Sequence, residues 1–597
     1  MAKKRPIKYT SRDFNSIKKD LEDYARRYYP DSYKDFTEAS FGSLMLDSVS
    51  YIGDILSYYL DYSVNESFFD TAIEYNNVLR HARRLGYKHA GNASSTGQAA
   101  LFILVPAATT GLGPDENYIP MLKRGATFTS TNGVNFMLTE NVNFNDPKVQ
   151  TVVARVNDTT GIPTFYALKT YGTVVSGEMI RERVTIKRFE RFRKIKLKNN
   201  NFTEMISITD AEGNVYHEVD HLSQNVVYKE FSNPNFSTDN TPSILKPVVV
   251  ARRFTVERDA LNNVFIQFGY GSDEDIDINA VADPSNVVID SHGKSYVTDI
   301  NFDPYKLMKT DKFGVAPSNT VLTINYRVNS PSNVNVGENA VVNVRTSEME
   351  FPDNTKINTT DKNSVTTSLE VTNENPIIGD VTVASVDEIK IRSKSFFASQ
   401  NRAVTAQDYE AVCYAMPEKF GAIKRCRVIQ DDNSMRRNIN ILVLSEDENE
   451  YLVKSSSTVK KNLKTWLSKY KMINDTIDIL DAYVVNLGID FKVTSEQDVN
   501  KFEILQNCVN IVKKEYENKS LIGQPFEISR LYKLLNKVEG VVDVKNVQIV
   551  QKTTSKYSSV TFPIDSMISP DGRYIMAPKN VVFEIKYPDS DIRGSVE

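Results

Sequence analysis

The segment most suggestive of chemistry is His217-Glu218-Val219-Asp220-His221, which spells H-E-x-x-H. On a helix, this spacing lets two histidines share one zinc ion while the glutamate activates the bound water. The surrounding sequence, VYHEVDHLSQNVVYKEF, is rich in β-branched and aromatic residues and follows a Gly213-Asn214 turn, so it favours a strand. Residues four apart in a strand are separated by about 13 Å. We therefore expect His217, Glu218 and His221 to bind no metal and to form no catalytic site.

Histidine and cysteine, the other residue types that often form catalytic or metal sites, are few in this chain. His81 and His89 flank Gly86 at a predicted helix end, where a histidine complements the helix dipole, and His292 precedes a glycine in a loop. The three cysteines are Cys413, Cys426 and Cys508, and no pair has Cys-x-x-Cys spacing. So few cysteines argue against a disulfide framework and for a reducing compartment. The sequence has no phosphate-binding glycine motif, so we predict no cofactor and no small-molecule substrate.

The amino-acid composition and net charge of the chain argue against nucleic acid and membranes as partners. The chain has 597 residues, of which 41% are hydrophobic and 25% charged, so it is an ordinary globular protein of about four domains. Its net charge of -4 gives no global basic field for nucleic acid or an anionic membrane. The longest apolar stretch, 99–108, is about half of what a membrane span needs. The basic N-terminus lacks the apolar run of a secretory signal.

The first 90 residues have the period of helices. A capping box over Thr10 to Asp13 opens a first helix, Ser40 caps a second, and a third begins near Asp70 and ends at Gly86. Apolar residues cover most of the circumference of the second helix, so we expect it to be buried on more than one side. Its candidate interface residues are Phe41, Leu44, Met45, Val49, Ile52, Ile55, Leu56 and Tyr59.

The period changes to two from Gln98 onwards, and helices return after residue 396. We predict an α+β multidomain protein with an N-terminal helical bundle (1–95), a β-rich middle of two subdomains (96–350), a linker and strand region (351–395), and a C-terminal mixed α+β sandwich (396–597). Residues 351–380 are polar and turn-rich, which predicts a loop or linker. The acidic segment 271–304 predicts a surface excursion.

One basic run stands out in the middle region. Residues 181–198, RERVTIKRFERFRKIKLK, alternate charged and apolar side chains with a period of two. The alternation predicts a half-buried strand pair with a positive outer face. Such a face is either simply solvated or a contact for another molecule.

Four widely separated segments resemble the baseplate J-like family, and within it the wedge proteins of T4-like contractile-tailed bacteriophages. They are FGSLMLDSVSYIGDILSYYLDYSVNESFFDTAIEYNNVLRHARRLGY at 41–87, FGYG at 268–271, APSNTVLTINYRVNSPSNVNVG at 316–337 and FFASQNRAVTAQDYEAV at 396–412. The positions that match the family are Glu66, Gly86, Gly269, Gly271, Tyr326, Arg327, Asn401, Arg402, Thr405, Asp408 and Tyr409. In the third segment, Asn329, Ser330 and Pro331 stand where the family has glycines.

The resemblance implies a structural role in the tail of a virion. Wedge proteins of this kind are homodimerising scaffolds that bundle their helices with other wedge subunits and join neighbouring wedges into a ring around the tail hub. Assembly would take place in the host cytoplasm, and no enzyme activity is implied. Two alternatives stay open from the residues alone: a zinc-dependent tail hydrolase built on His217, Glu218 and His221, and a receptor-binding tail module. The single tryptophan, Trp466, falls on a predicted helix face, which disfavours the receptor-binding alternative.

Overall fold

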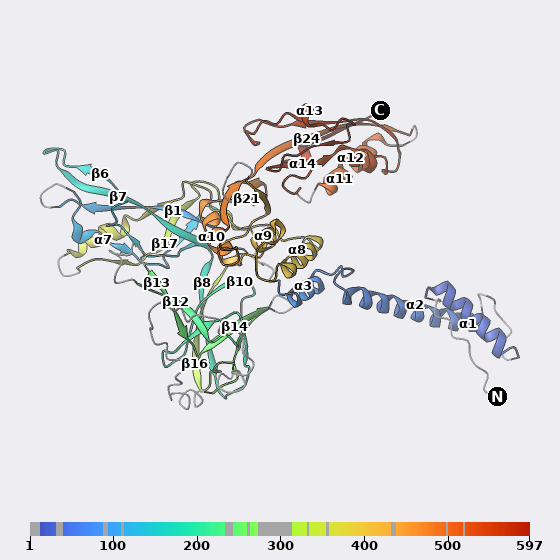
Figure 1. The fold of residues 1–597 in the computed structure, drawn as a ribbon, viewed down its shortest axis with the longest axis horizontal. Coiled ribbons are helices and arrows are strands. Elements are labelled where there is room, and N and C mark those ends of the chain that lie inside the picture. Colours follow the sequence, from blue (N-terminus) through green and yellow to red (C-terminus); the bar gives the residue numbers. More distant parts are fainter. Residues whose placement is uncertain are drawn as a thin grey trace. The chain divides into compact units, whose positions relative to one another are not determined.

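The structure is a computed structural model, and it describes residues 12–31, 37, 40–87, 93–108, 113–232, 243–258, 263–272, 313–330, 333–353, 357–431, 438–496, 499–516 and 520–597. The chain divides into two compact units (Figure 1). Unit 1 comprises residues 1–89 and 384–394, and unit 2 comprises residues 90–383 and 395–597. Over the described residues, no helix is both long enough and apolar enough to cross a membrane. The predicted class, a mixed α+β multidomain protein with N-terminal helices, is confirmed.

Unit 1 is built from α1 (Phe14–Tyr28), α2 (Phe41–Ser67), α3 (Tyr75–Arg84) and the first part of α8 (Val386–Ser399). Ser40 caps α2 as predicted, because its side chain accepts a hydrogen bond from the Ser43 N–H. The cap of α1 differs from the prediction: Asp13 itself is the N-cap, and Thr10 lies outside the described residues. Gly86 ends α3 as predicted, with a φ of 84° that a glycine adopts without strain.

Unit 2 begins with a seven-stranded sheet in the order β17-β3-β4-β7-β1-β19, with β6 paired to β7. Its strands are β1 (Thr96–Pro106), β3 (Thr127–Ser130), β4 (Asn135–Leu138), β6 (Gln150–Val156), β7 (Pro163–Ser176), β17 (Val341–Thr346) and β19 (Glu370–Thr372). A small sheet of β2 (Met121–Leu122), β5 (Val142–Asn143) and β18 (Met349–Glu350) shares its apolar core. Leu101, Phe128 and Phe136 lie fully buried in that core.

A second seven-stranded sheet has the order β8-β16-β10-β11-β14-β15-β9. Its strands are β8 (Glu178–Ile186), β9 (Lys194–Lys196), β10 (Phe202–Thr209), β11 (Val215–Glu218), β14 (Arg253–Arg258), β15 (Val264–Phe268) and β16 (Thr320–Val328). The ends of the sheet, β8 and β9, are joined by a short turn, and Lys198 reaches Glu182 across them at 3.9 Å. The sheet therefore curls so that its two edges meet. A separate hairpin consists of β12 (Val226–Ser232) and β13 (Ser243–Val249).

The C-terminal part of unit 2 carries two further α+β layers. The first has β20 (Arg425–Gln430), β21 (Asn438–Glu446), β22 (Leu452–Val453) and β23 (Thr476–Asp481) with α9 (Ala406–Tyr414) and α10 (Ser457–Leu467). The second has β24 (Tyr483–Ser495), β26 (Val541–Gln551), β28 (Val581–Glu584) and β29 (Ile592–Val596) with α11 (Lys501–Glu515) and α12 (Ile528–Leu535). Cys413 and Cys508 are buried on α9 and α11.

The prediction of a loop or linker over residues 351–380 is wrong. The expected loop contains a helix, α7 (Thr359–Thr367), which Asn358 caps by accepting a hydrogen bond from the Thr360 N–H. Its buried residue is Val365, which joins the core beneath β1. Helix α8 runs through residue 395 without interruption, and the division between the two units falls between residues 394 and 395 of this helix. Residues 386–395 were expected in a linker and strand region, although they have good helix formers and an acidic first turn.

Candidate functional site

The most unusual surface of unit 1 is the apolar side of α2. Most of its large apolar residues are exposed, with side chains open to solvent by 73% at Phe41, 57% at Ile52 and 66% at Leu60. The candidate interface residues Phe41, Leu44, Met45, Val49, Ile52, Leu56 and Tyr59 all belong to this exposed set, and Ile55 is half-buried. At 100° per residue these side chains form one broad stripe. We call this stripe the α2 apolar face.

The opposite side of α2 packs against α1 and is made of small or polar residues. Ser43 and Ser50 are the buried residues there, and they are seven positions apart, which places them on one line along the helix. Gly53 lies on the same side of the helix, and a Cβ added to it would come within 3.1 Å of the Ile17 side chain of α1. The two helices therefore approach closely through small residues.

Charges fasten the α1–α2 hairpin at two points. Lys18 pairs with Asp47 at 2.7 Å and Arg12 pairs with Asp61 at 3.0 Å. Both acids lie on the α1-facing side of α2, so ion pairs join the two helices there, while the α2 apolar face remains exposed. This is the reverse of an ordinary amphipathic hairpin, whose apolar sides meet each other.

Glu66, a family-motif position, anchors the C-terminal end of α2. Its carboxylate accepts hydrogen bonds from the Ile73 N–H at 2.8 Å, the Asn77 side chain at 2.9 Å and the Glu74 N–H at 3.3 Å. These bonds, led by that from Ile73, lower the pKa of Glu66, so the carboxylate stays charged. The chain reversal between α2 and α3 is thereby fixed within unit 1.

In unit 2, the family-motif glycines of FGYG close the curled sheet. A Cβ at Gly269 would lie 2.1 Å from the Gly314 carbonyl oxygen, so only glycine fits. The Gly271 N–H donates to the same oxygen at 2.9 Å. Their role in this structure is to let the backbone after β15 lie close to the backbone that leads into β16.

Tyr326 and Arg327 are both fully buried on β16. The Tyr326 hydroxyl donates to Glu182 at 3.2 Å, and the Arg327 guanidinium donates to the Ser94 hydroxyl at 2.9 Å, to Glu204 at 3.2 Å and to the Ser176 carbonyl oxygen. Burial lowers the pKa of Arg327, against the effect of Glu204. Both residues therefore have a structural role. The hydrogen bonds of Arg327 connect the start of β1 and the end of β7 to the curled sheet.

The fourth motif lies around the start of α9. Thr405 and Asp408 form a reciprocal capping box. Asn401 has a φ of 60°, a left-handed conformation that asparagine tolerates well. Arg402 is exposed, while the buried Tyr409 donates its hydroxyl to Asp475 at 2.6 Å. The motif therefore shapes the entry to a helix.

The H-E-x-x-H segment is a strand followed by a turn, as its flanking residues predicted. His217 and Glu218 are on β11, which runs parallel to β14, and His221 lies three residues beyond Glu218 outside the strand. His217 meets Lys229 at 3.2 Å, and burial together with that ammonium lowers its pKa. In the described part of the chain, no group of three or more His, Cys, Asp or Glu side chains is placed to hold a metal. His89 and His292 lie outside the described residues.

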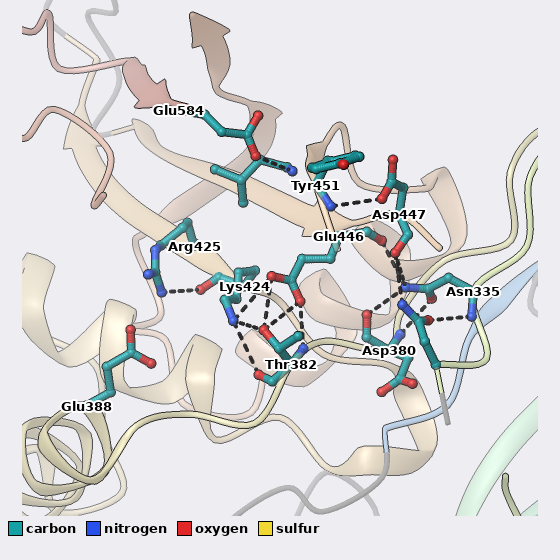
Figure 2. Close-up of polar contacts among 12 residues, drawn as sticks. Asn335, Asp380, Thr382, Glu388, Lys424, Arg425, Glu446, Asp447, Tyr451 and Glu584 are labelled. Atoms are coloured by element: carbon teal, nitrogen blue, oxygen red, sulfur yellow. Dashed lines mark hydrogen bonds and ion pairs between the residues drawn. The ribbon is translucent and has the colours of Figure 1, made fainter. Parts of the chain in front are cut away.

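Sequence reasoning missed a buried polar junction in unit 2 (Figure 2). The Asn335 side chain accepts from the backbone N–H groups of Gly379 and Asp380, both at 3.0 Å, and donates to the Glu446 carbonyl oxygen at 3.0 Å. Glu446, which is 1% exposed, pairs with Lys424 at 3.2 Å and accepts from the Thr382 N–H at 2.6 Å. The junction joins three segments far apart in sequence, and no local motif announces it.

Asp380 in this junction has a perturbed pKa. Burial raises the pKa to about 6, and a hydrogen bond from the Val334 N–H at 3.2 Å only partly opposes that effect. The neighbouring carboxylates Glu446 and Glu450 raise the pKa further. The group therefore titrates below neutral pH within a structural contact.

Comparison with known proteins relates the N-terminal helices to phage tails. Residues 13–84, which contain α1, α2 and α3, match the family described as bacteriophage baseplate protein, N-terminal domain. No curated protein matches the chain. The matched helices are those that carry the α2 apolar face, so the match supports a structural, baseplate-related role for this protein.

Two solved structures also resemble the chain weakly. One is a chain in the cryo-EM structure of the anti-feeding prophage baseplate, with a TM-score of 0.24 and 9% identity over 95% of this chain and 90% of that chain. The other is a chain of the type VI secretion system TssK-TssF-TssG baseplate subcomplex, with a TM-score of 0.21 and 8% identity over 74% of this chain and 96% of that chain. Scores of this size do not establish a shared fold.

Proposed function

We propose that this protein is a structural subunit of a bacteriophage tail baseplate wedge that links neighbouring wedges into a ring around the tail hub. In this proposal it belongs with the wedge proteins of T4-like contractile tails, and it assembles in the host cytoplasm with other wedge subunits and with a second copy of itself. The family match of residues 13–84 and the four resembling segments support this proposal. Neither nucleic acid, membrane nor a small-molecule substrate has a part in it.

The observation that carries the proposal is the α2 apolar face. A 27-residue helix with most of its large apolar side chains in solvent is unfavourable for an isolated soluble chain. Burying one Leu- or Ile-sized side chain contributes about 1.5–3 kcal/mol, so a stripe of this length offers a large driving force for association. Because α1 already covers the polar side, the occupant of the apolar face comes from another chain, and an apolar helix fits a stripe of this shape.

The test is a charge substitution along the middle of the stripe. We expect the wild-type chain to sediment as a dimer or larger species at micromolar concentration, and the triple variant Met45→Lys, Ile52→Lys, Tyr59→Lys to sediment as a monomer. Circular dichroism should be unchanged, because the three side chains are exposed in the single chain. In phage that carry the same triple variant, electron microscopy should show tails without closed baseplate rings.

A matched control places three lysines on exposed valines elsewhere, namely Val152→Lys, Val321→Lys and Val542→Lys. This control should associate and assemble like the wild type. Wild-type protein that stays monomeric across the micromolar range would contradict the self-association. A triple α2 variant that stays dimeric would place the homodimer contact on another surface of the chain.

The zinc-hydrolase alternative has a direct test as well. Elemental analysis of the purified protein should show no stoichiometric zinc, and His221→Ala should leave the metal content unchanged. Stoichiometric zinc that disappears in His221→Ala would revive that alternative. No observation in the structure favours it, since His217 is on a strand and contacts a lysine.

A further inference from the structure

A positively charged surface covers the outside of β8, β9 and the turn between them. On β8, Glu182 and Ile186 are buried, whereas Arg181 and Arg183 alternate with them and are exposed. On β9, Ile195 is buried between exposed lysines. The exposed cations Arg181, Arg183, Lys187, Arg188, Arg191 and Lys196 form what we call the basic face.

The basic face is not neutralised by its neighbours in the sheet. Across β16, Arg181 lies opposite Asn325 and Arg183 opposite Thr323, and neither neighbour carries a charge. The ion pairs in this area, Lys194 with Glu257 at 2.7 Å and Arg193 with Glu190 at 3.2 Å, use other cations. Among the residues that the structure describes, none of the six cations of the basic face has an ion pair.

An acidic segment of the same chain follows residues that lie beside this face. Residues 273–304 come directly after Ser272, and residues 305–312, which include Lys306, Lys309 and Lys312, connect them to Phe313. The Phe192 ring, in the β8–β9 turn, lies 5.7 Å from the Tyr270 ring and 6.0 Å from the Phe313 ring. The Arg191 guanidinium lies over the Tyr270 ring at 4.5 Å. The residues that precede the acidic segment therefore lie at the turn that carries part of the basic face, and Phe313, which follows it after residues 305–312, lies at the same turn.

The charge of the segment complements that of the face. Its acidic residues are Asp273, Glu274, Asp275, Asp277, Asp283, Asp290, Asp299 and Asp303, against a single lysine, Lys294. The four acids up to Asp277 are within seven residues of Tyr270, so an extended chain keeps them within about 25 Å of it. A tether this short gives an effective concentration on the order of millimolar, which favours a contact in the same chain over one between chains.

We propose that the basic face is the docking surface for the acidic segment 273–304 of the same chain. The contact is electrostatic, so it weakens with salt. While it holds, it screens the basic face from other polyanions in the cell. It is independent of the α2 apolar face and of the proposed wedge function.

The direct test is zero-length carbodiimide cross-linking of the full chain, which joins carboxylates to lysines that are in contact. In dilute protein at low salt, we expect links from Asp273–Asp283 to Lys187 or Lys196 within one chain. In an equal mixture of isotopically light and heavy protein, these links should stay within single isotope forms. Their yield should fall about fivefold in 0.5 M NaCl, where the screening length is only a few ångströms.

Charge reversal of two arginines tests the face without removing the reactive lysines. The variant Arg188→Glu, Arg191→Glu should lose the links, and the matched control Lys461→Glu, Lys579→Glu, which reverses two exposed cations elsewhere, should keep them. Absence of the links in the wild type, or links that survive 0.5 M NaCl, would overturn the proposal. Links found mainly between light and heavy chains would also overturn it and would make a second copy the occupant.

Retention on heparin gives an independent measurement that needs no cross-link. Neutralising the segment by Asp273→Asn, Glu274→Gln, Asp275→Asn and Asp277→Asn should uncover the basic face and raise the salt needed for elution. The control neutralises four exposed acids elsewhere, by Asp146→Asn, Asp158→Asn, Glu370→Gln and Glu539→Gln, and gives the same net charge. Equal elution of the two variants would contradict the docking.

Discussion

Helices α2 and α11 have similar apolar spacing but opposite burial. In α11, Ile504, Cys508 and Val512 recur every four residues and are buried against the sheet of β24 and against α12. In α2, the buried positions Ser43 and Ser50 are polar, and the apolar stripe is exposed. The comparison shows that a hydrophobic period predicts a helix and its stripe, whereas the location of the covering surface depends on the rest of the assembly.

The two units also differ in how they hold charges. The Arg12–Asp61 pair of the α1–α2 hairpin is more than half exposed on both sides, whereas Lys424 and Glu446 of the polar junction are nearly fully buried. A buried ion must be paired, because its desolvation is not repaid otherwise. Substitutions in unit 2 should therefore affect the stability of the single chain, and substitutions on α2 should affect association instead.

The largest effect is expected from Glu446→Gln in the polar junction. It leaves the Lys424 ammonium buried beside a neutral amide, which should cost roughly 3–5 kcal/mol of unfolding free energy. Urea unfolding of the full chain measures this cost. The double variant Lys424→Met, Glu446→Gln should recover part of the loss, and a double variant that is less stable than Glu446→Gln alone would contradict the explanation.

Matched leucine truncations test the comparison of the helices directly. Leu531→Ala in α12 removes a fully buried side chain from the core that α11 shares, and it should cost about 2–5 kcal/mol. Leu56→Ala on the α2 apolar face should change the stability of the monomer by less than about 0.5 kcal/mol, because the side chain is exposed. A large loss at Leu56 in monomeric protein would show that α2 is covered within its own chain.

A pH measurement addresses Asp380 in the junction. Its pKa is raised to about 6 in the fold, above the ordinary value of 3.8, so the folded protein binds this proton more tightly than the unfolded chain does. Its contribution to stability is therefore fully present below about pH 4 and is lost as the pH rises through about 6, by roughly 1–3 kcal/mol in total. Asp380→Asn should remove that pH dependence.

The control for this measurement is Asp146→Asn, at an exposed aspartate far from the junction in sequence. We expect it to keep the wild-type pH dependence between pH 4 and 7. If Asp380→Asn and the wild type lost stability in parallel over that range, the titrating group would be another residue.

Local signals predicted local structure well. The cap at Ser40 and the stop at Gly86 were both confirmed, because each depends on neighbouring residues only. Helix α7 was missed because its sequence, TTDKNSVTT, has little intrinsic preference for a helix; packing of Val365 under β1 and the hydrogen bond from the Leu104 N–H to Ser368 stabilise it.

The polar junction was missed for a different reason. Asn335, Asp380 and Glu446 come from segments that only the tertiary fold brings together, so no spacing in the sequence connects them. The α2 apolar face, by contrast, could be proposed from the sequence, since one segment contains all of it. The partner of this face could not be predicted, because the sequence of one chain does not specify the surface that covers it.

The smallest effect is expected from the Arg12–Asp61 pair that fastens the exposed hairpin. Both side chains are largely in water, where an ion pair contributes only about 0.2–1 kcal/mol and salt screens it. A double-mutant cycle with Arg12→Ala and Asp61→Ala should give a coupling in that range at low salt and close to zero in 0.5 M NaCl. Hydrogen exchange of the α1 amides is the suitable readout, because α1 opens without unfolding unit 2. A coupling above about 2 kcal/mol would mean that the hairpin is held by its charges as firmly as unit 2 is held by its junction.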